Sequence, residues 1–264
     1  EPKNTRYRLE RWLTPDGKIL TGALPKSLEH RHYGSNIVTY LLYQHHHCQV
    51  TQPLLLEQLK EWGIVISSGQ LDRLLTVNKE RFHNEKDDLL KVGLAESSYV
   101  TVDDSSARHK GKNGYVTHIG NDFFAWFSST DKKSRANFLS LLQSKKTTYF
   151  LCEDAFEYML TRQLPPFQIE KLKVLTELEY SDKDSWEELL ESIGITSIRH
   201  VRSATEGALM GALLKDNNLE HLAIISDGAG QFNILQHGLC WVHAERLIHT
   251  MIPLNEKHRE DIKI

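Results

Sequence analysis

The sequence predicts an α/β fold in which a sheet-forming region follows a mainly α-helical N-terminal region. Valine, threonine and tyrosine form a strand over Tyr99–Asp104, and two further short strands follow it through tight connections. A second apolar run, over 221–226, ends in an acid and a glycine turn. Apolar residues recur at helical spacing over 35–92. These patterns divide the chain into a region 1–97 and a region 98–264.

The composition is that of an ordinary globular protein. The 264 residues are 40% hydrophobic and 25% charged, and the net charge of -3 argues against a surface covered in phosphate contacts. A local basic face remains compatible with that charge. The three cysteines are odd in number and far apart, which predicts a reducing, cytoplasmic location without a disulfide framework. No signal peptide is evident, and no run of about 18 apolar residues predicts a membrane span or a membrane partner.

The first part of the chain predicts a short β-hairpin followed by a helix. Residues 7–13 alternate in polarity, Pro15–Lys18 is a turn, and Ile19–Thr21 is the returning strand. A helix is expected from Ser35 to His47. Its run of three histidines at 45–47 is not a predicted metal site, because adjacent residues on a helix point in different directions.

Residues 51–76 have the pattern of two helices joined by a turn. Pro53 lies in the first turn of one helix, and Gly63 suits its C-terminal cap. Ser67 and Gln70 form a capping box at the start of the next helix. This pattern leaves a DNA-binding helix-turn-helix and a plain helical pair both open. Arg73 is the candidate for DNA contact on the second helix.

The region after residue 97 begins with three strands and a helix. The strands are expected at Tyr99–Asp104, Gly114–Ile119 and Phe123–Phe127, and the helix at Ser134–Gln143. Three antiparallel strands followed by a helix is how an RNase H-like domain begins, with a metal-binding acid on its first strand. Residues 145–220 predict an inserted helical subdomain, because loops of that length rarely lack structure.

Three blocks of sequence agree with one family. They are Val102–Ser105 with Arg108, Ile225–Phe232, and Cys240–Arg246. On these blocks the chain resembles bacterial DDE transposases of the insertion sequence sixty-six group, and segment 40–75 resembles the part that precedes their catalytic core. The resemblance implies an RNase H-like catalytic core that cleaves DNA and transfers strands. It also implies two Mg²⁺ or Mn²⁺ ions, transposon-end and target DNA as partners, and homo-oligomers assembled on DNA.

The resemblance assigns catalytic and metal-binding roles to Asp103 and Asp227. Asp104 should point to the opposite face of its strand and act as a neighbour of the site. Asp154 competes with Asp227, because residues 149–154 are also an apolar run that ends in acids. Asp227 is preferred because the Cys240 block follows it. The third acid of the family, a glutamate, is expected beyond Ile264, so we expect both chain ends to continue in a longer polypeptide and this part alone to be inactive.

Other residues of these blocks have supporting roles in this interpretation. Cys240 and His243 do not complete a zinc site by themselves and, with Arg246, are expected to orient a helix start near the active site. The turn after Asp103 contains four basic candidates for DNA phosphate contact: Arg108, His109, Lys110 and Lys112. A second basic cluster contains Lys132, Lys133 and Arg135. Ordinary solvated turns are the alternative for both clusters.

Two other functions remain open from the sequence. A nuclease of the same fold would use the same acids without strand transfer. A non-catalytic helix-turn-helix DNA-binding or regulatory protein would have a degenerate RNase H-like domain.

Overall fold

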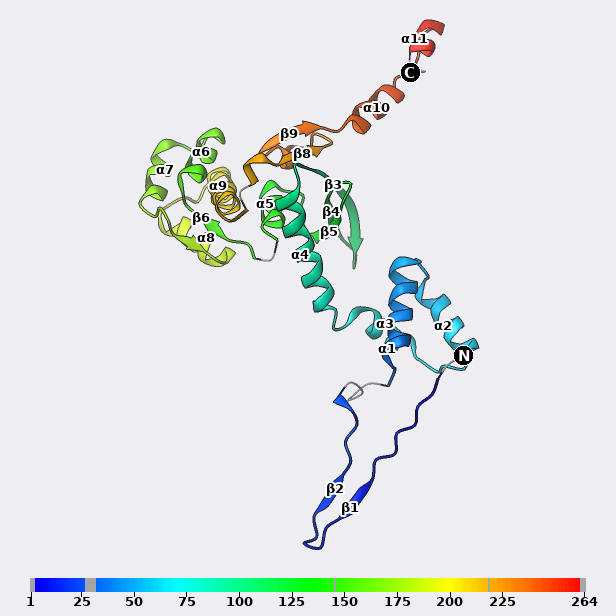
Figure 1. Ribbon diagram of the computed structural model, residues 1–264. Coiled ribbons are helices and arrows are strands. Elements are labelled where there is room, and N and C mark those ends of the chain that lie inside the picture. The colour runs from blue at the N-terminus through cyan, green and yellow to red at the C-terminus, as the bar shows by residue number, and fades with distance from the viewer. Residues whose placement is uncertain (1–2, 27–31, 145, 218, 262–264) are drawn as a thin grey trace. The chain divides into compact units, whose positions relative to one another are not determined.

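A computed structural model describes residues 3–26, 32–144, 146–217 and 219–261 (Figure 1). The chain divides into two compact units, Glu1–Arg81 and Phe82–Ile264. The secondary structure of the first unit is β1 (Arg11–Leu13), β2 (Ile19–Thr21), α1 (Ser35–Leu42), the π-helix η2 (Tyr43–His47), α2 (Gln52–Glu61) and α3 (Ser68–Thr76). Helix α4 (Glu80–Glu96) begins at the end of this unit and continues into the second.

The first unit contains the predicted hairpin and helices. Strands β1 and β2 pair antiparallel, with Trp12 opposite Leu20, and their side chains are exposed. The helices enclose a small leucine core of Leu41, Leu55, Leu59, Leu71 and Leu75. Gly63 follows α2 with a φ of +73°, and the Ser67 hydroxyl accepts a hydrogen bond from the Gln70 backbone N–H at 3.2 Å. Both predicted helix-end signals are therefore confirmed.

A mixed five-stranded sheet organises the second unit. Its strands are β3 (Tyr99–His109), β4 (Lys112–Gly120), β5 (Ala125–Thr130), β8 (Ala223–Ser226) and β9 (Gln236–Leu239). The spatial order is β5-β4-β3-β8-β9. Strands β3, β4 and β5 form the predicted antiparallel meander, whereas β8 is parallel to β3 and β9 is parallel to β8. The fold of this unit is therefore α/β, as predicted.

Helix α4 and the helix after β5 lie beside the sheet, and the later helices before β8 form a group to one side of it (Figure 1). Helix α5 (Arg135–Leu142) follows β5. The next elements are α6 (Glu153–Thr161), α7 (Pro166–Lys173), α8 (Lys183–Ser192) and α9 (Ile198–Asn217), with a small sheet of β6 (Tyr149–Phe150) and β7 (Glu179–Tyr180). Short 3₁₀ turns η3 (Leu219–His221) and η4 (Gly230–Phe232) flank β8, and α10 (Trp241–His249) and α11 (Glu256–Asp261) follow β9. In the described part of the chain, no helix is both long and apolar enough to cross a bilayer.

Helices α6 to α9 lie in the segment where the sequence predicted a helical insertion, but the last of them is longer than expected. Helix α9 runs over Ile198–Asn217, whereas the sequence indicated a helix only over 206–214. A Cβ atom at Gly207 would lie 2.5 Å from Met159 Cγ, and one at Gly211 would lie 2.6 Å from the Phe150 carbonyl oxygen. The helix therefore packs closely through small residues, which give little apolar periodicity in the sequence.

Helix α4 packs with the sheet that follows it. Leu90 and Leu94 are buried in the same core as Val100 and Phe124. A Cβ atom at Gly93 would lie 2.6 Å from the Phe124 ring, so the helix approaches that ring closely. The boundary between the two units along the chain therefore follows Arg81, whereas the sequence placed it at residue 97.

Candidate active site

The parallel pairing of β3 with β8 brings Asp103 and Asp227 to matching positions. The last paired residues are Thr101 and Ile225. Asp103 lies two residues beyond Thr101, and Asp227 lies two residues beyond Ile225. Neighbouring strands in a sheet are about 5 Å apart. Asp227 directly follows the end of β8, whereas Asp103 lies within β3, which continues to His109 and not to the end at Asp104 that the sequence predicted, because residues 105–109 pair with β4. The two acids therefore start from adjacent places on two neighbouring strands.

The alternation of buried and exposed residues along β3 and β8 indicates that the Asp103 and Asp227 side chains lie on the same face of the sheet. Val100 and Val102 on β3 are buried, and Ser226 at the end of β8 is 1% exposed. Asp103 follows the buried Val102, and Asp227 follows the buried Ser226. Because successive side chains along a strand point to opposite faces, the exposed Asp103 and Asp227 side chains face away from this core. Among the described residues, neither carboxylate forms an ion pair with lysine or arginine.

The order of the strands reverses between β3 and β8. The chain adds β4 and β5 on one side of β3 and then adds β8 and β9 on the other. In open α/β sheets, ligands bind outside the carboxyl ends of the strands at such a reversal. Asp103 and Asp227 flank this point, which makes it the candidate active site.

His118 is the cross-strand partner of Asp103 on β4. Burial lowers the pKa of the His118 imidazole, and the Asp103 carboxylate opposes this by a smaller amount. The neutral imidazole is therefore favoured beside the candidate site.

Asp104 points to the other face of the sheet, as strand alternation predicts. Its Oδ1 accepts a short hydrogen bond from the Thr117 hydroxyl, and its Oδ2 accepts one from Gln231 Nε2 at 3.0 Å. Thr117 is buried, and Gln231 lies four residues beyond Asp227. Asp104 thus links β3 to the segment that follows the second acid.

The structure separates Asp154 from the central sheet. Asp154 lies in the first turn of α6, directly after β6. Strand β6 pairs with β7 in the small two-stranded sheet and not with β3. Of the two alternatives that the sequence left open, Asp227 is therefore the residue that follows a strand paired with β3.

The Cys240 block starts a helix at the same edge. The Cys240 backbone N–H donates to the Ser226 carbonyl oxygen at 2.8 Å, and Cys240 is the N-cap residue of α10. His243 lies in the first turn of α10 with a buried Nδ1 that has no hydrogen-bond partner, and Arg246 lies in the last turn. The start of α10 is thus tied to the residue immediately before Asp227.

Local hydrogen bonds shape the turn that begins at Asp227. The Ser226 hydroxyl lies 2.8 Å from His237 Nε2 and accepts from the Gly228 backbone N–H at 3.1 Å. Asp227 Oδ1 accepts from the Ala229 backbone N–H at 2.9 Å. Gly228 has a φ of +87°, a conformation that favours glycine. The Asp-Gly pair was recognisable in the sequence, but nothing there indicated the role of His237.

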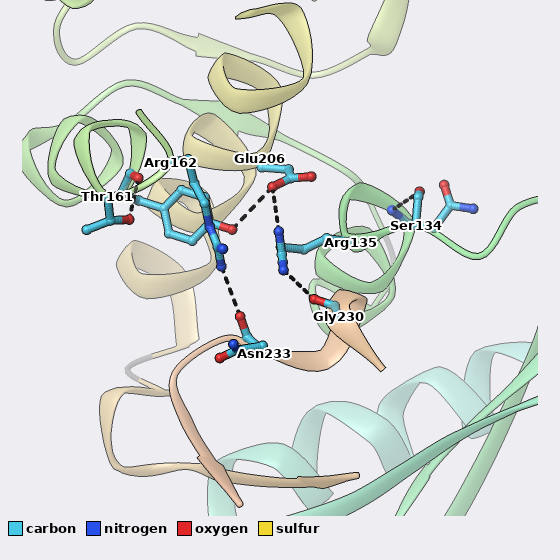
Figure 2. Close-up of polar contacts among 9 residues, drawn as sticks. Ser134, Arg135, Thr161, Arg162, Glu206, Gly230 and Asn233 are labelled. Atoms are coloured by element: carbon cyan, nitrogen blue, oxygen red, sulfur yellow. Dashed lines mark hydrogen bonds and ion pairs between the residues drawn. The ribbon is translucent and has the colours of Figure 1, made fainter. Parts of the chain in front are cut away.

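Arg135 is not part of an exposed basic cluster, whereas both interpretations of Lys132, Lys133 and Arg135 placed it on an exposed surface. Its side chain is 16% exposed and its Nη1 lies 3.1 Å from Glu206 Oε2. Its Nη2 donates to the Gly230 carbonyl oxygen (Figure 2). This pairing was not predictable from local sequence patterns, because the partners lie far apart along the chain.

The predicted DNA-binding residues lie at two exposed places. Arg108, His109, Lys110 and Lys112 are exposed at the tip of the β3–β4 hairpin, where His109 pairs with Lys112. The turn between them has positive φ at Lys110 and Gly111. Arg73 lies on α3 in the first unit, and its Nη2 donates to Gln70 Oε1 at 3.0 Å.

The donor chemistry at the sheet edge fits a hard divalent cation. Carboxylate oxygens are the preferred ligands of Mg²⁺, and Asp103 and Asp227 supply them from the same face. Within the described ranges, no three or more His, Cys, Asp or Glu side chains are grouped so that they could hold a metal ion. The pair thus supplies a partial ligand set.

Comparisons with known proteins give little functional information. No protein-family model matches the chain, and no solved structure matches it. The uncharacterized protein y4jO of Sinorhizobium fredii (strain NBRC 101917 / NGR234) is 34% identical over 177 residues. The match covers 66% of this chain and 55% of y4jO, so the chain spans just over half of that relative's length. The name of y4jO states no activity, and function must be argued from the residues.

Proposed function

We propose that this chain is part of a bacterial DNA transposase of the insertion sequence sixty-six group, with an RNase H-like core. The main support is the register of β3 and β8, which gives Asp103 and Asp227 equivalent positions on neighbouring strands. Three antiparallel strands followed by α5 agree with the way such a core begins. The reaction is DNA strand cleavage and strand transfer in the bacterial cytoplasm.

Asp103 and Asp227 are the residues that would hold Mg²⁺ or Mn²⁺. Divalent ions at such a site stabilise charge on the attacking and leaving oxygens of an in-line phosphoryl displacement. The two carboxylates come from matching register positions on neighbouring strands and form no ion pair with lysine or arginine among the described residues, so their charge is available to a metal. A third carboxylate, a glutamate, is part of the proposal.

The tip of the β3–β4 hairpin is positively charged, and β3 connects this tip to Asp103. Arg108, His109, Lys110 and Lys112 follow Asp103 on the same hairpin. Because the whole chain has a net charge of -3, attraction of DNA phosphates requires such a local group of basic residues. In the proposal these residues contact DNA, and homo-oligomers bring transposon ends and target DNA together.

Binding of Mn²⁺ tests the site directly. Titration of the chain with Mn²⁺, followed by electron paramagnetic resonance, should give one saturable class of site. Asp103→Asn and Asp227→Asn should each weaken binding by about tenfold or more, since each removes one charged ligand. Asp154→Asn is the matched control and should bind as the unaltered chain does. Equal binding by Asp227→Asn and the unaltered chain would contradict the assignment.

A non-catalytic DNA-binding protein is the second candidate, because the first unit has a capped α3 with Arg73 on its exposed side. In that case Arg73→Ala should weaken DNA binding strongly, whereas Lys112→Ala should have little effect and Mn²⁺ should not bind. Under the transposase proposal Lys112→Ala weakens DNA binding and the metal binds. Fluorescence anisotropy with labelled duplex DNA measures the first difference.

A further inference from the structure

The segment after Asp227, residues 228–233, is held by side chains from two helical elements, α5 and the end of α6. Arg135 on α5 donates to the Gly230 carbonyl oxygen, and Arg162 at the end of α6 donates to the Asn233 carbonyl oxygen at 3.0 Å (Figure 2). Phe232 is buried and packs edge-to-face on Phe138 of α5, with ring centroids 4.9 Å apart. The segment is therefore fixed through both its backbone and its side chain.

The position of the Arg135 guanidinium is set by α9 and α6. Glu206 of α9 is 4% exposed, and its Oε2 lies 3.1 Å from Arg135 Nη1. The Tyr158 hydroxyl of α6 donates to the same oxygen at 3.4 Å. Figure 2 shows the guanidinium between this carboxylate and the Gly230 carbonyl. A planar guanidinium can donate to two acceptors in fixed directions, which a lysine ammonium does less well.

Arg135 and Arg162 are oriented by these contacts, although not every donor of their guanidinium groups is hydrogen-bonded. The Nε atoms of Arg135 and Arg162 are both buried without a hydrogen-bond partner. Buried donors are normally paired, so the geometry favours the terminal nitrogens at the expense of Nε. In both arginines a terminal nitrogen donates to a backbone carbonyl of the segment that follows Asp227.

We propose that Arg135, oriented by Glu206, is a positioning residue for Asp227, and that the helical insertion thereby sets the geometry of the metal site. The role of Asp227 as a metal ligand rests on the proposed function. Gln231, in the same segment, donates to Asp104 on β3, and β3 is held independently by its pairing with β4. The contacts of Arg135, Arg162 and Phe138 with residues 230–233, which we call the clamp, therefore act on the segment that follows Asp227.

Hydrogen exchange of the full chain, measured by mass spectrometry, tests the clamp. Arg135→Lys retains the charge that Glu206 requires but loses the second, directed donor to Gly230. We expect the amides of 228–234, which include the hydrogen-bonded Gly228, Ala229 and Phe232, to exchange about tenfold faster. Peptides from the β3 strand should exchange as in the unaltered chain. Arg199→Lys is the matched control. Arg199 lies on α9, as Glu206 does, but its guanidinium donates to Gln163 and not to residues 228–233.

Glu206→Gln provides an independent variant, because it keeps the shape of the side chain and removes the charge that orients Arg135. It should also speed exchange in 228–234, and either variant should weaken Mn²⁺ binding about threefold to tenfold relative to Arg199→Lys. Exchange in 228–234 that matches the Arg199→Lys control in both variants would overturn the clamp. Faster exchange with unchanged Mn²⁺ affinity would overturn the positioning of a metal ligand. Absence of Mn²⁺ binding by the unaltered chain would instead overturn the proposed function, while the exchange result would still decide the clamp.

Discussion

Replacement of Gly211 by alanine tests the close packing of α9, the helix that contains Glu206. A Cβ atom at this position would lie 2.6 Å from the Phe150 carbonyl oxygen, 2.9 Å from Ala155 Cβ and 3.0 Å from Cys152 Sγ. Alanine is favoured over glycine inside a helix by about 1 kcal/mol. Overpacking of a filled core costs about 1–3 kcal/mol, and the nearest atom here is backbone, which cannot rotate away.

The steric cost should therefore exceed the gain in helix propensity. We expect Gly211→Ala to lower the free energy of unfolding of the second unit by up to about 2 kcal/mol, measured by urea denaturation with tryptophan fluorescence. Trp186 is a suitable probe, because it is fully buried and donates to Thr205 on α9. Gly69→Ala is the control: Gly69 is in α3 and has no heavy atom within 4 Å of the added Cβ. A Gly211→Ala protein stabilised as much as Gly69→Ala would refute this packing argument.

Three further predictions concern the elements around the site. Ser134→Ala removes the hydroxyl that accepts from the Asn137 N–H and should cost about 1 kcal/mol in thermal unfolding, with Ser134→Asp retaining the cap. Asp103→Asn should lower the pKa of His118 further in an NMR titration, because the opposing carboxylate is lost; an unchanged pKa would contradict the contact. Burial lowers the pKa of His118 in the folded state, so the unfolded chain binds a proton at this residue more readily. The free energy of unfolding should therefore decrease as the pH falls below about 6.5. Lys112→Ala should reduce the salt dependence of DNA binding by about 0.9 in log–log slope, whereas loss of affinity without a change in slope would exclude a phosphate contact.

The strands and their acids were predictable because both signals are local. β-Branched residues indicated β3, and an apolar run ending in Asp-Gly indicated β8 and its turn. The parallel pairing of the two strands, which gives Asp103 and Asp227 matching positions, was not predicted from the sequence. The sequence preferred Asp227 over Asp154 because the Cys240 block follows it, and strand pairing adds a second distinction, since only the strand before Asp227 pairs with β3.

The contacts that hold the site were not predictable, because their partners are distant in the sequence. Arg135 follows two lysines and has the local pattern of a surface charge cluster, but Glu206 on α9 converts it into a buried ion pair. The length of α9 was underestimated because glycine and alanine pack closely without giving a strong apolar period. Long-range pairing and close backbone packing are decided by tertiary structure, which local patterns do not record.

The pairing of Thr101 with Ile225 also constrains how the chain folds. Closing the roughly 120 residues between these partners costs more chain entropy than forming the β3–β4 hairpin, whose strands are joined by a tight turn. Contacts between distant residues generally form slowly, so the basic hairpin tip should be complete before β8 joins β3. During folding, such a molecule would already present its positive charges to DNA while its two acids were still apart. In the proposed enzyme, affinity for DNA would therefore develop before the capacity to cut it.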